Sequence, residues 1–202
     1  MPDISEIKLY ARKNDVPIMQ DQSQQFICEY IKNHNYKKIL EIGTAIGYST
    51  IQFAKTSPDV KVTSIELDID RFIKARQNVE DCNLQDRITL INENALDTQL
   101  DDKFDLIFID GPKAQYIKFF EKYKNNLNPN GVIISDNLFF HGMVEDLTLT
   151  HNYSTIKLVK KIRKYIDFLK NNQEFTTEFF ELGDGISVSS PKKSIENIIS
   201  NT

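Results

Sequence analysis

The stretch FDLIFIDGPKAQY, residues 104–116, is a nearly continuous apolar run that ends abruptly in Asp110 and a Gly-Pro pair. A short apolar run bounded by glycine and proline is typical of a strand buried on both faces, as in a parallel sheet. A second stretch, GVIISDNLFFHG at residues 131–142, repeats the pattern and ends its apolar run in Asp136 and Asn137. Both predicted strands therefore place polar side chains at their carboxyl ends.

The rest of the chain alternates predicted strands and helices. Strands are expected at 37–43, 61–66, 87–92, 104–110 and 131–136, helices at 22–35, 48–57, 68–83, 114–127 and 154–172, and a hairpin around Gly-Asp-Gly at 183–185. This alternation predicts an α/β, Rossmann-like fold: a mostly parallel seven-stranded sheet with helices on both faces and a C-terminal antiparallel hairpin. In such sheets ligands bind beyond the carboxyl ends of the strands.

The composition is that of one globular domain, which we expect to span residues 1–202. The chain is 40% hydrophobic and 27% charged, and its net charge of −4 does not indicate a nucleic-acid or membrane protein. Its two cysteines, Cys28 and Cys82, have no partners at metal-ligand spacing, which argues against a disulfide framework or a zinc site. Because no signal peptide or apolar run of membrane-spanning length is present, we expect a cytoplasmic protein.

The segment LEIGTAIGYS, residues 40–49, predicts a ligand-binding turn between the first strand and a helix. Gly43 allows the backbone to approach a ligand closely, and Glu66 ends the next strand, where its carboxylate can accept hydrogen bonds from a ribose. The glycine spacing is not that of a dinucleotide site. The pattern favours a ligand with a ribose and an anionic group, such as S-adenosylmethionine. The alternative is an ordinary tight turn with a solvated Glu66.

The polar residues at the ends of the strands predicted at 104–110 and 131–136 form a candidate metal site. Asp110, Asp136 and Asn137 offer two carboxylates and one amide oxygen, a hard ligand set suited to Mg²⁺. Lys113 follows Asp110 by three residues and could accept a proton from a bound substrate. Each residue also has a simpler interpretation, as a turn residue or a solvated lysine.

Several motifs together resemble a known family. VPIMQ, LEIGTAIGYST, SIELD, FDLIFIDGPKAQY, NPNGVIISDNLFFHGMV and LGDGISVS occur in the order found in cation-dependent class I S-adenosylmethionine O-methyltransferases of the catechol and caffeoyl-CoA type. The resemblance covers roughly residues 9–190. It implies the class I methyltransferase fold and is closest to bacterial enzymes that methylate 5-hydroxyuridine at the tRNA wobble position.

The resemblance also implies roles for individual residues. Lys113 would be the catalytic base, and Asp110, Asp136 and Asn137 would bind Mg²⁺ or another divalent cation. The residues implied to bind S-adenosylmethionine are Met19, Glu41, Gly43, Ser49, Glu66, Asn94, Ala95 and Asp110. Phe139 and Phe140 are expected to pack rather than stack on a base, and His141 to be an ordinary loop residue.

The expected acceptor is the 5-hydroxyl of 5-hydroxyuridine in the tRNA anticodon loop. The segment 157–170 carries six basic residues against one acidic residue, and such a helix face could bind RNA phosphates or could simply be solvated. The alternative function is methylation of a small compound with vicinal hydroxyls; a third is a binding protein without turnover. A homodimer is possible, although the family's additional N-terminal helix is missing from this sequence.

Overall fold

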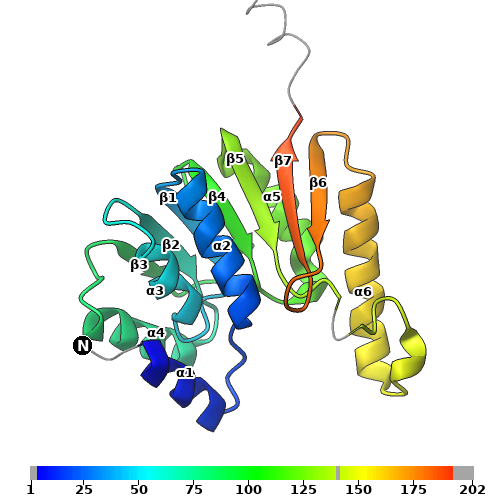
Figure 1. The fold of residues 1–202 in the computed structure, drawn as a ribbon, viewed down its shortest axis with the longest axis horizontal. Coiled ribbons are helices and arrows are strands. Elements are labelled where there is room, and N and C mark those ends of the chain that lie inside the picture. The colour runs from blue at the N-terminus through cyan, green and yellow to red at the C-terminus, as the bar shows by residue number, and fades with distance from the viewer. Residues whose placement is uncertain (1–3, 140–141, 193–202) are drawn as a thin grey trace, which may run out of the picture.

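The computed structural model describes residues 4–139 and 142–192, so the ends of the predicted domain, Phe140 and His141 lie outside the described residues. Its centre is a seven-stranded sheet with the order β3-β2-β1-β4-β5-β7-β6 (Figure 1). The strands are β1 (Lys38–Ile42), β2 (Lys61–Ile65), β3 (Ile88–Ile91), β4 (Phe104–Ile109), β5 (Leu127–Ser135), β6 (Phe175–Phe180) and β7 (Ile186–Pro191).

The first five strands are parallel, and β7 pairs antiparallel with both β5 and β6. This arrangement confirms the predicted α/β fold with its C-terminal hairpin. The chain reverses direction along the sheet between β1 and β4, whose carboxyl ends lie side by side. That pair of strand ends is the switch point at which ligands bind in open α/β sheets.

Helices cover both faces of the sheet, with α2 in front of it and α5 behind it in Figure 1. The helices are α1 (Ile4–Lys13), α2 (Asp21–Asn33), α3 (Tyr48–Ala54), α4 (Ile69–Asp81), α5 (Tyr116–Tyr123) and α6 (Tyr153–Lys170), with 3₁₀ turns at η1 (Lys113–Gln115), η2 (Lys124–Asn126) and η3 (Leu147–Leu149). No helix in the described ranges is long and apolar enough to cross a membrane.

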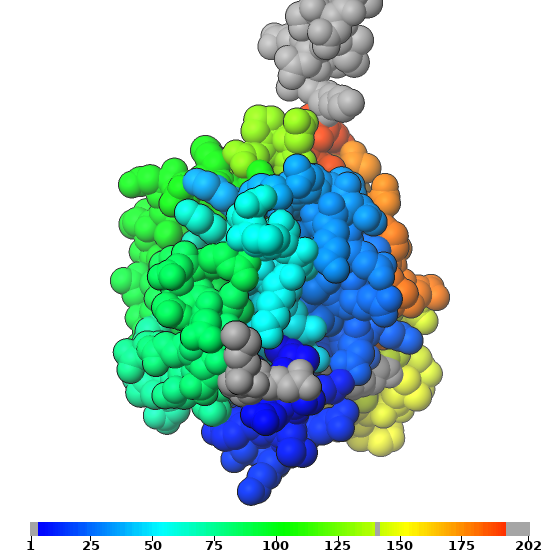
Figure 2. Space-filling view, turned by 60° about the vertical axis from the view of Figure 1, so that its left-hand side comes forward, coloured from blue at the N-terminus to red at the C-terminus, as the bar shows by residue number. Residues whose placement is uncertain are grey.

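Successive residues of each central strand pack into two separate apolar cores, one on each face of the sheet. On β4, Leu106 and Phe108 pack with α1 to α4, whereas Ile107 and Ile109 pack with α5 and α6. The continuous apolar run of β4 follows from this burial on both faces. Figure 2 shows α2 and α3, in blue and cyan, covering the first face, with α1 in dark blue below them.

Three elements differ from the prediction. The helix predicted at 114–127 is shorter, because α5 ends at Tyr123 and is flanked by the 3₁₀ turns η1 and η2. Helix α1 was not predicted, because its buried positions, Ile7 and Ala11, span only one turn of an otherwise polar segment. Strand β5 begins at Leu127 rather than at residue 131, because Leu127 already pairs with Phe104 before the register shifts. The Pro and Gly residues between these points resemble a turn in the sequence but are accommodated within an irregular strand pair.

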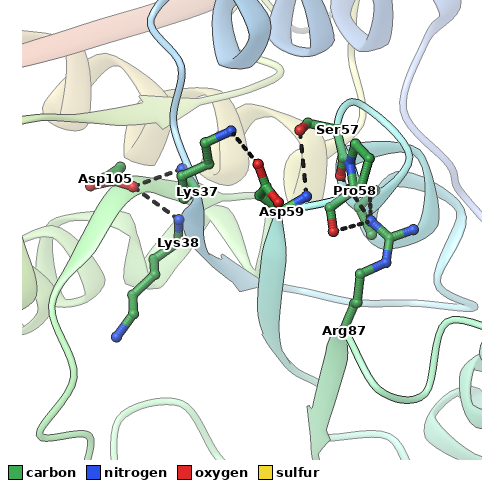
Figure 3. A network of polar contacts seen from close by, with 8 residues as sticks. Lys37, Lys38, Ser57, Pro58, Asp59, Arg87 and Asp105 are labelled. Carbon is green, nitrogen blue, oxygen red and sulfur yellow. Dashed lines mark hydrogen bonds and ion pairs between the residues drawn. The ribbon is translucent and has the colours of Figure 1, made fainter.

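At the amino ends of the strands, polar contacts tie the sheet together away from the ligand-binding edge (Figure 3). The Asp105 carboxylate accepts hydrogen bonds from the backbone N–H groups of Lys37 (2.8 Å) and Lys38 (2.9 Å), joining β4 to the start of β1. Arg87 donates to the carbonyls of Ala54 (2.6 Å) and Ser57 (2.8 Å). These contacts fix the connections that enter β1, β2 and β3.

At the carboxyl ends of the parallel strands, the Gly-Asp-Gly hairpin packs against the segment that follows β5. The N–H of Leu138 donates to the Gly185 carbonyl (3.0 Å), and the N–H of Phe139 donates to the Asp184 carbonyl (2.7 Å). Gly185 has φ +90°, and a Cβ atom there would lie 2.6 Å from the Phe139 ring. The hairpin turn therefore fits only because position 185 has no side chain.

We predict that Gly185→Ala lowers the free energy of unfolding by roughly 2–4 kcal/mol, because it adds a clash to left-handed backbone strain. Gly142→Ala is the matched control, since Gly142 has φ +78° but the nearest neighbour to its added Cβ is 3.7 Å away. Urea denaturation of both variants measures the difference. Equal destabilisation by the two substitutions would contradict the packing argument.

Candidate active site

A cavity of about 600 Å³ opens at the carboxyl ends of β1, β2 and β4. This volume is typical of a site for a small ligand or cofactor. Most of the residues predicted to bind cofactor, metal or substrate line it. They are Met19, Gly43, Glu66, Asn94, Ala95, Asp110, Lys113 and Asn137.

The turn after β1 is shaped by contact with β4. Gly43 has φ +103°, and a Cβ there would lie 2.5 Å from the Asp110 carbonyl oxygen, so only glycine fits. Its N–H donates to the Ile65 carbonyl (3.0 Å) at the end of β2. The buried carboxylate of Glu66 accepts hydrogen bonds from the N–H groups of Ala45 (2.8 Å) and Asp68 (2.9 Å). Glu66 therefore braces this turn while also lining the cavity.

Two predicted cofactor residues, Glu41 and Ser49, are not among the residues that line the cavity. The Glu41 carboxylate is fully buried beneath the turn and accepts hydrogen bonds from Ser49 (2.5 Å), Ser64 (2.5 Å) and Thr50. Burial raises the pKa of Glu41 to about 7, although these hydroxyl donors oppose the increase. The observed contacts give Glu41 and Ser49 a supporting place under the turn, and direct cofactor contact by either stays a prediction.

Asp136 is fully buried where β5 ends. Its Oδ1 accepts hydrogen bonds from the Asn137 N–H (2.8 Å) and from the Ser23 hydroxyl (3.3 Å). Its Oδ2 has no hydrogen-bond partner among the residues that the structure describes. Burial, reinforced by the nearby charge of Asp110, raises the pKa of Asp136 well above its ordinary value. A buried carboxylate with an unsatisfied oxygen is costly unless a cation or proton compensates it.

Lys113 brings the two strand ends together. Its Nζ donates to Asp110 Oδ1 (3.1 Å), Asn137 Oδ1 (2.8 Å) and the Tyr116 hydroxyl (2.5 Å). The Tyr116 hydroxyl also donates to the Asp136 carbonyl (3.3 Å). Burial, with added repulsion from Asp110 and Asp136, raises the pKa of Tyr116 well above its ordinary value, so its hydroxyl stays protonated.

Of the four residues predicted to form the metal and base site, Asp110, Lys113 and Asn137 line the cavity. The fully buried Asp136 does not line it but is joined to the others through the Asn137 N–H and the Tyr116 hydroxyl. Asn137 adopts φ +60°, a left-handed conformation that asparagine tolerates better than most residues. No group of three or more His, Cys, Asp or Glu side chains is placed to bind a metal within residues 4–139 and 142–192. Any cation bound at this cluster would therefore depend on the amide oxygen of Asn137 as well as the two carboxylates.

Two residues of the site were not identified as such from the sequence. Tyr116 was predicted only as part of a helix at 114–127, although its spacing of three residues from Lys113 was a usable signal. Ser23 lies 113 residues from Asp136 in the chain, and nothing in its local sequence indicates the contact. Gly183 packs so closely against Ser23 that a Cβ would lie 2.4 Å from its hydroxyl oxygen.

Comparison with known proteins agrees with this geometry. The profile of a family described as O-methyltransferase matches residues 3–192. The chain belongs to this O-methyltransferase family. This membership, together with the relatives described below, confirms the predicted enzyme class, an S-adenosylmethionine-dependent O-methyltransferase of the catechol and caffeoyl-CoA type.

Solved structures of similar proteins share the whole fold. A candidate caffeoyl-CoA O-methyltransferase from Staphylococcus aureus is 36% identical, with a TM-score of 0.90 over 95% of this chain and 93% of that one. An O-methyltransferase from Bacillus cereus, solved in complex with SAH, is 26% identical, with a TM-score of 0.81 over 95% of this chain and 93% of the other. The class I methyltransferase fold is therefore confirmed.

Curated relatives of this O-methyltransferase are similar over different lengths. A candidate caffeoyl-CoA O-methyltransferase of Dictyostelium discoideum is 26% identical over 196 residues, which are 89% of this chain and 78% of the relative. A catechol O-methyltransferase of Niastella koreensis is 32% identical over 117 residues, covering 54% of this chain and 53% of the relative.

We predict that Glu41 makes the protein less stable as the pH rises from about 4.5 to about 7. In this window the unfolded carboxyl has already lost its proton while the folded one retains it, so higher pH favours unfolding. The slope from this group is at most about 1.4 kcal/mol per pH unit. Glu41→Gln should remove it, as measured by urea denaturation of both proteins between pH 5 and pH 8; parallel stability curves would contradict the prediction.

Proposed function

We propose that this enzyme methylates one hydroxyl of a small aromatic compound with two adjacent oxygens, using a divalent cation held by Asp110, Asp136 and Asn137. The observation that carries the proposal is the buried Oδ2 of Asp136, which has no hydrogen-bond partner within residues 4–139 and 142–192. A second carboxylate, Asp110, and the amide of Asn137 are its neighbours. Two adjacent oxygens of an acceptor are suited to fill open positions on such a cation.

S-adenosylmethionine would occupy the cavity at the switch point. Glu66 would accept hydrogen bonds from the ribose hydroxyls, and the turn at Gly43 leaves room for close approach of the ligand. Asn94 and Ala95 line the part of the cavity next to β3 and would contact the adenine. The SAH bound to the Bacillus cereus relative supports this use of the fold.

The donor set fits a divalent cation. Burial, and next the charge of Asp110, raise the pKa of Asp136, and a cation would offset both the burial and the repulsion. All three candidate ligands present oxygen atoms, as Mg²⁺ prefers. A bound cation would supply Lewis acidity that lowers the pKa of the acceptor hydroxyl.

Lys113 would perform the proton transfer. In its neutral form its amine accepts the hydroxyl proton of the acceptor, leaving an oxyanion directed at the sulfonium methyl group. The oxygen–carbon bond forms as the carbon–sulfur bond breaks, and S-adenosylhomocysteine is released. The protein's main contribution is to hold the two reactants in line.

The relatives from Staphylococcus aureus, Dictyostelium discoideum and Niastella koreensis are named as caffeoyl-CoA or catechol O-methyltransferases, and they support a small-molecule acceptor. A second candidate acceptor, 5-hydroxyuridine in tRNA, is supported by exposed lysines on α6, which could contact phosphates. Arg163 does not belong to this exposed group, because it donates to the Val144 carbonyl (2.7 Å) and holds the loop before α6. The exposed lysines of this surface are Lys157, Lys160, Lys161, Lys164 and Lys170.

The deciding experiment measures methyl transfer from labelled S-adenosylmethionine to a catechol, to caffeoyl-CoA and to hydroxyuridine-containing tRNA, each with Mg²⁺ or with EDTA. We expect label in a small vicinal diol that is lost with EDTA. Label only in tRNA would overturn the small-molecule proposal, and Lys160→Glu with Lys161→Glu should then reduce tRNA methylation but not that of free nucleoside. Transfer unaffected by EDTA would overturn the metal assignment.

Cation binding can be tested without turnover. We predict that MgCl₂ raises the melting temperature of the wild-type protein in a concentration-dependent way, because a ligand that binds only the folded state stabilises it. Asp136→Asn should abolish this shift, since it replaces Oδ2 with an N–H donor while keeping the side-chain shape. Asp59→Asn, which alters an exposed carboxylate near the amino ends of the strands, is the control. An unchanged shift in Asp136→Asn would count against the site.

A further inference from the structure

The Tyr116 hydroxyl has no role in the chemistry proposed above, yet it makes the shortest of the three contacts to Lys113. Its oxygen lies 2.5 Å from Lys113 Nζ and 3.3 Å from the Asp136 carbonyl oxygen, to which it donates. The side chain is 1% exposed. This buried hydroxyl accepts from Lys113 and donates to the Asp136 carbonyl, and the Asp110 carboxylate also lies close enough to raise its pKa, so its polar neighbours fix its orientation.

The ring of Tyr116 is held rigidly. It packs edge-to-face against Tyr165 of α6, with ring centroids 5.1 Å apart and an interplanar angle of 84°. This ring contact does not involve the Tyr165 hydroxyl, which lies 2.7 Å from the Ser135 hydroxyl at the end of β5. The Tyr116 ring is therefore held by packing, whereas the Lys113 side chain has four rotatable bonds.

Lys113 and a bound cation would compete for the same side-chain oxygens. Its ammonium group has three hydrogens, and it donates to three acceptors: Asp110, Asn137 and Tyr116. Asp110 and Asn137 are also proposed cation ligands, and an oxygen directed at a cation is a poorer acceptor for Lys113. Tyr116 is the member of this trio with no such second role.

We propose that Tyr116 is a positioning residue for Lys113. Its hydroxyl oxygen accepts a hydrogen bond from the amine in both the charged and the neutral state, while the hydroxyl donates its own hydrogen bond to the Asp136 carbonyl oxygen. This anchor keeps Nζ beside the acceptor when the other two oxygens are engaged, and it directs an N–H of the neutral amine away from the substrate. The inference rests on the proposed role of Lys113 as base.

The first test compares Tyr116→Phe with Tyr165→Phe. Each change removes one fully buried hydroxyl and keeps the ring, but only the first hydroxyl contacts Lys113. We expect Tyr116→Phe to lower kcat roughly 10- to 100-fold with little change in KM, because misplacing a reacting group has costs of this order. Tyr165→Phe should retain near wild-type kcat, and equal effects of the two variants would overturn the proposal.

A double-mutant cycle separates this inference from the proposed function. If Tyr116 acts through Lys113, Tyr116→Phe should cause no further loss of kcat in a Lys113→Met background. A multiplicative further loss would overturn the positioning role. Full activity of Lys113→Met alone would instead show that the base assignment, and with it the proposed mechanism, is wrong.

A third readout needs no catalytic turnover. The rate at which acetic anhydride modifies Lys113 in the free protein can be followed by mass spectrometry, with the exposed Lys118 as internal reference. We expect Tyr116→Phe to increase the relative rate for Lys113, because the amine loses its closest partner, and Tyr165→Phe to leave it unchanged. An unchanged rate in Tyr116→Phe would show that the hydroxyl does not restrain Lys113.

Discussion

The burial of the Asp136 carboxylate is the constraint on which the arrangement of the site depends. A fully buried carboxylate is costly unless its oxygens are satisfied, and here only Oδ1 has hydrogen-bond partners among the described residues. The Ser23 donor comes from α2, and Ser23 is itself packed against Gly183 of the terminal hairpin. The N-terminal helix layer, β5 and the C-terminal hairpin therefore meet around a single acidic side chain.

The charged Lys113 side chain has one hydrogen for each of three acceptors at these strand ends, whereas its neutral amine has only two hydrogens. Lys113 donates to Asp110, Asn137 and Tyr116. If two of these oxygens serve a cation, the third keeps the amine in place, which divides the cluster into ligands and an anchor. A rigid phenol suits the second task, because its ring is fixed in the core and its hydroxyl remains protonated.

Much of the fold and part of the site were predictable from local patterns. Continuous apolar runs such as β4 identify buried parallel strands, and polar residues at their ends, such as Asp110 and Asp136, must meet because the strands are parallel neighbours. The start of β5 at Leu127 was misplaced because Pro and Gly residues mimic a turn. The weakly apolar α1 was missed because it buries few residues.

By itself, the sequence determined the α/β class, the order along the chain of the seven strands and of the helices after α1, and the positions of the polar residues at strand ends. These depend on hydrophobic periodicity and on glycine spacing. Tertiary structure alone decided which polar groups are buried and what they contact. Three kinds of contact depend on side-chain directions and packing. They are the hydrogen bonds that three hydroxyls donate to Glu41, the Ser23 contact to Asp136 and the Tyr116 contact to Lys113. Such contacts join distant or differently oriented segments, and no local pattern records them.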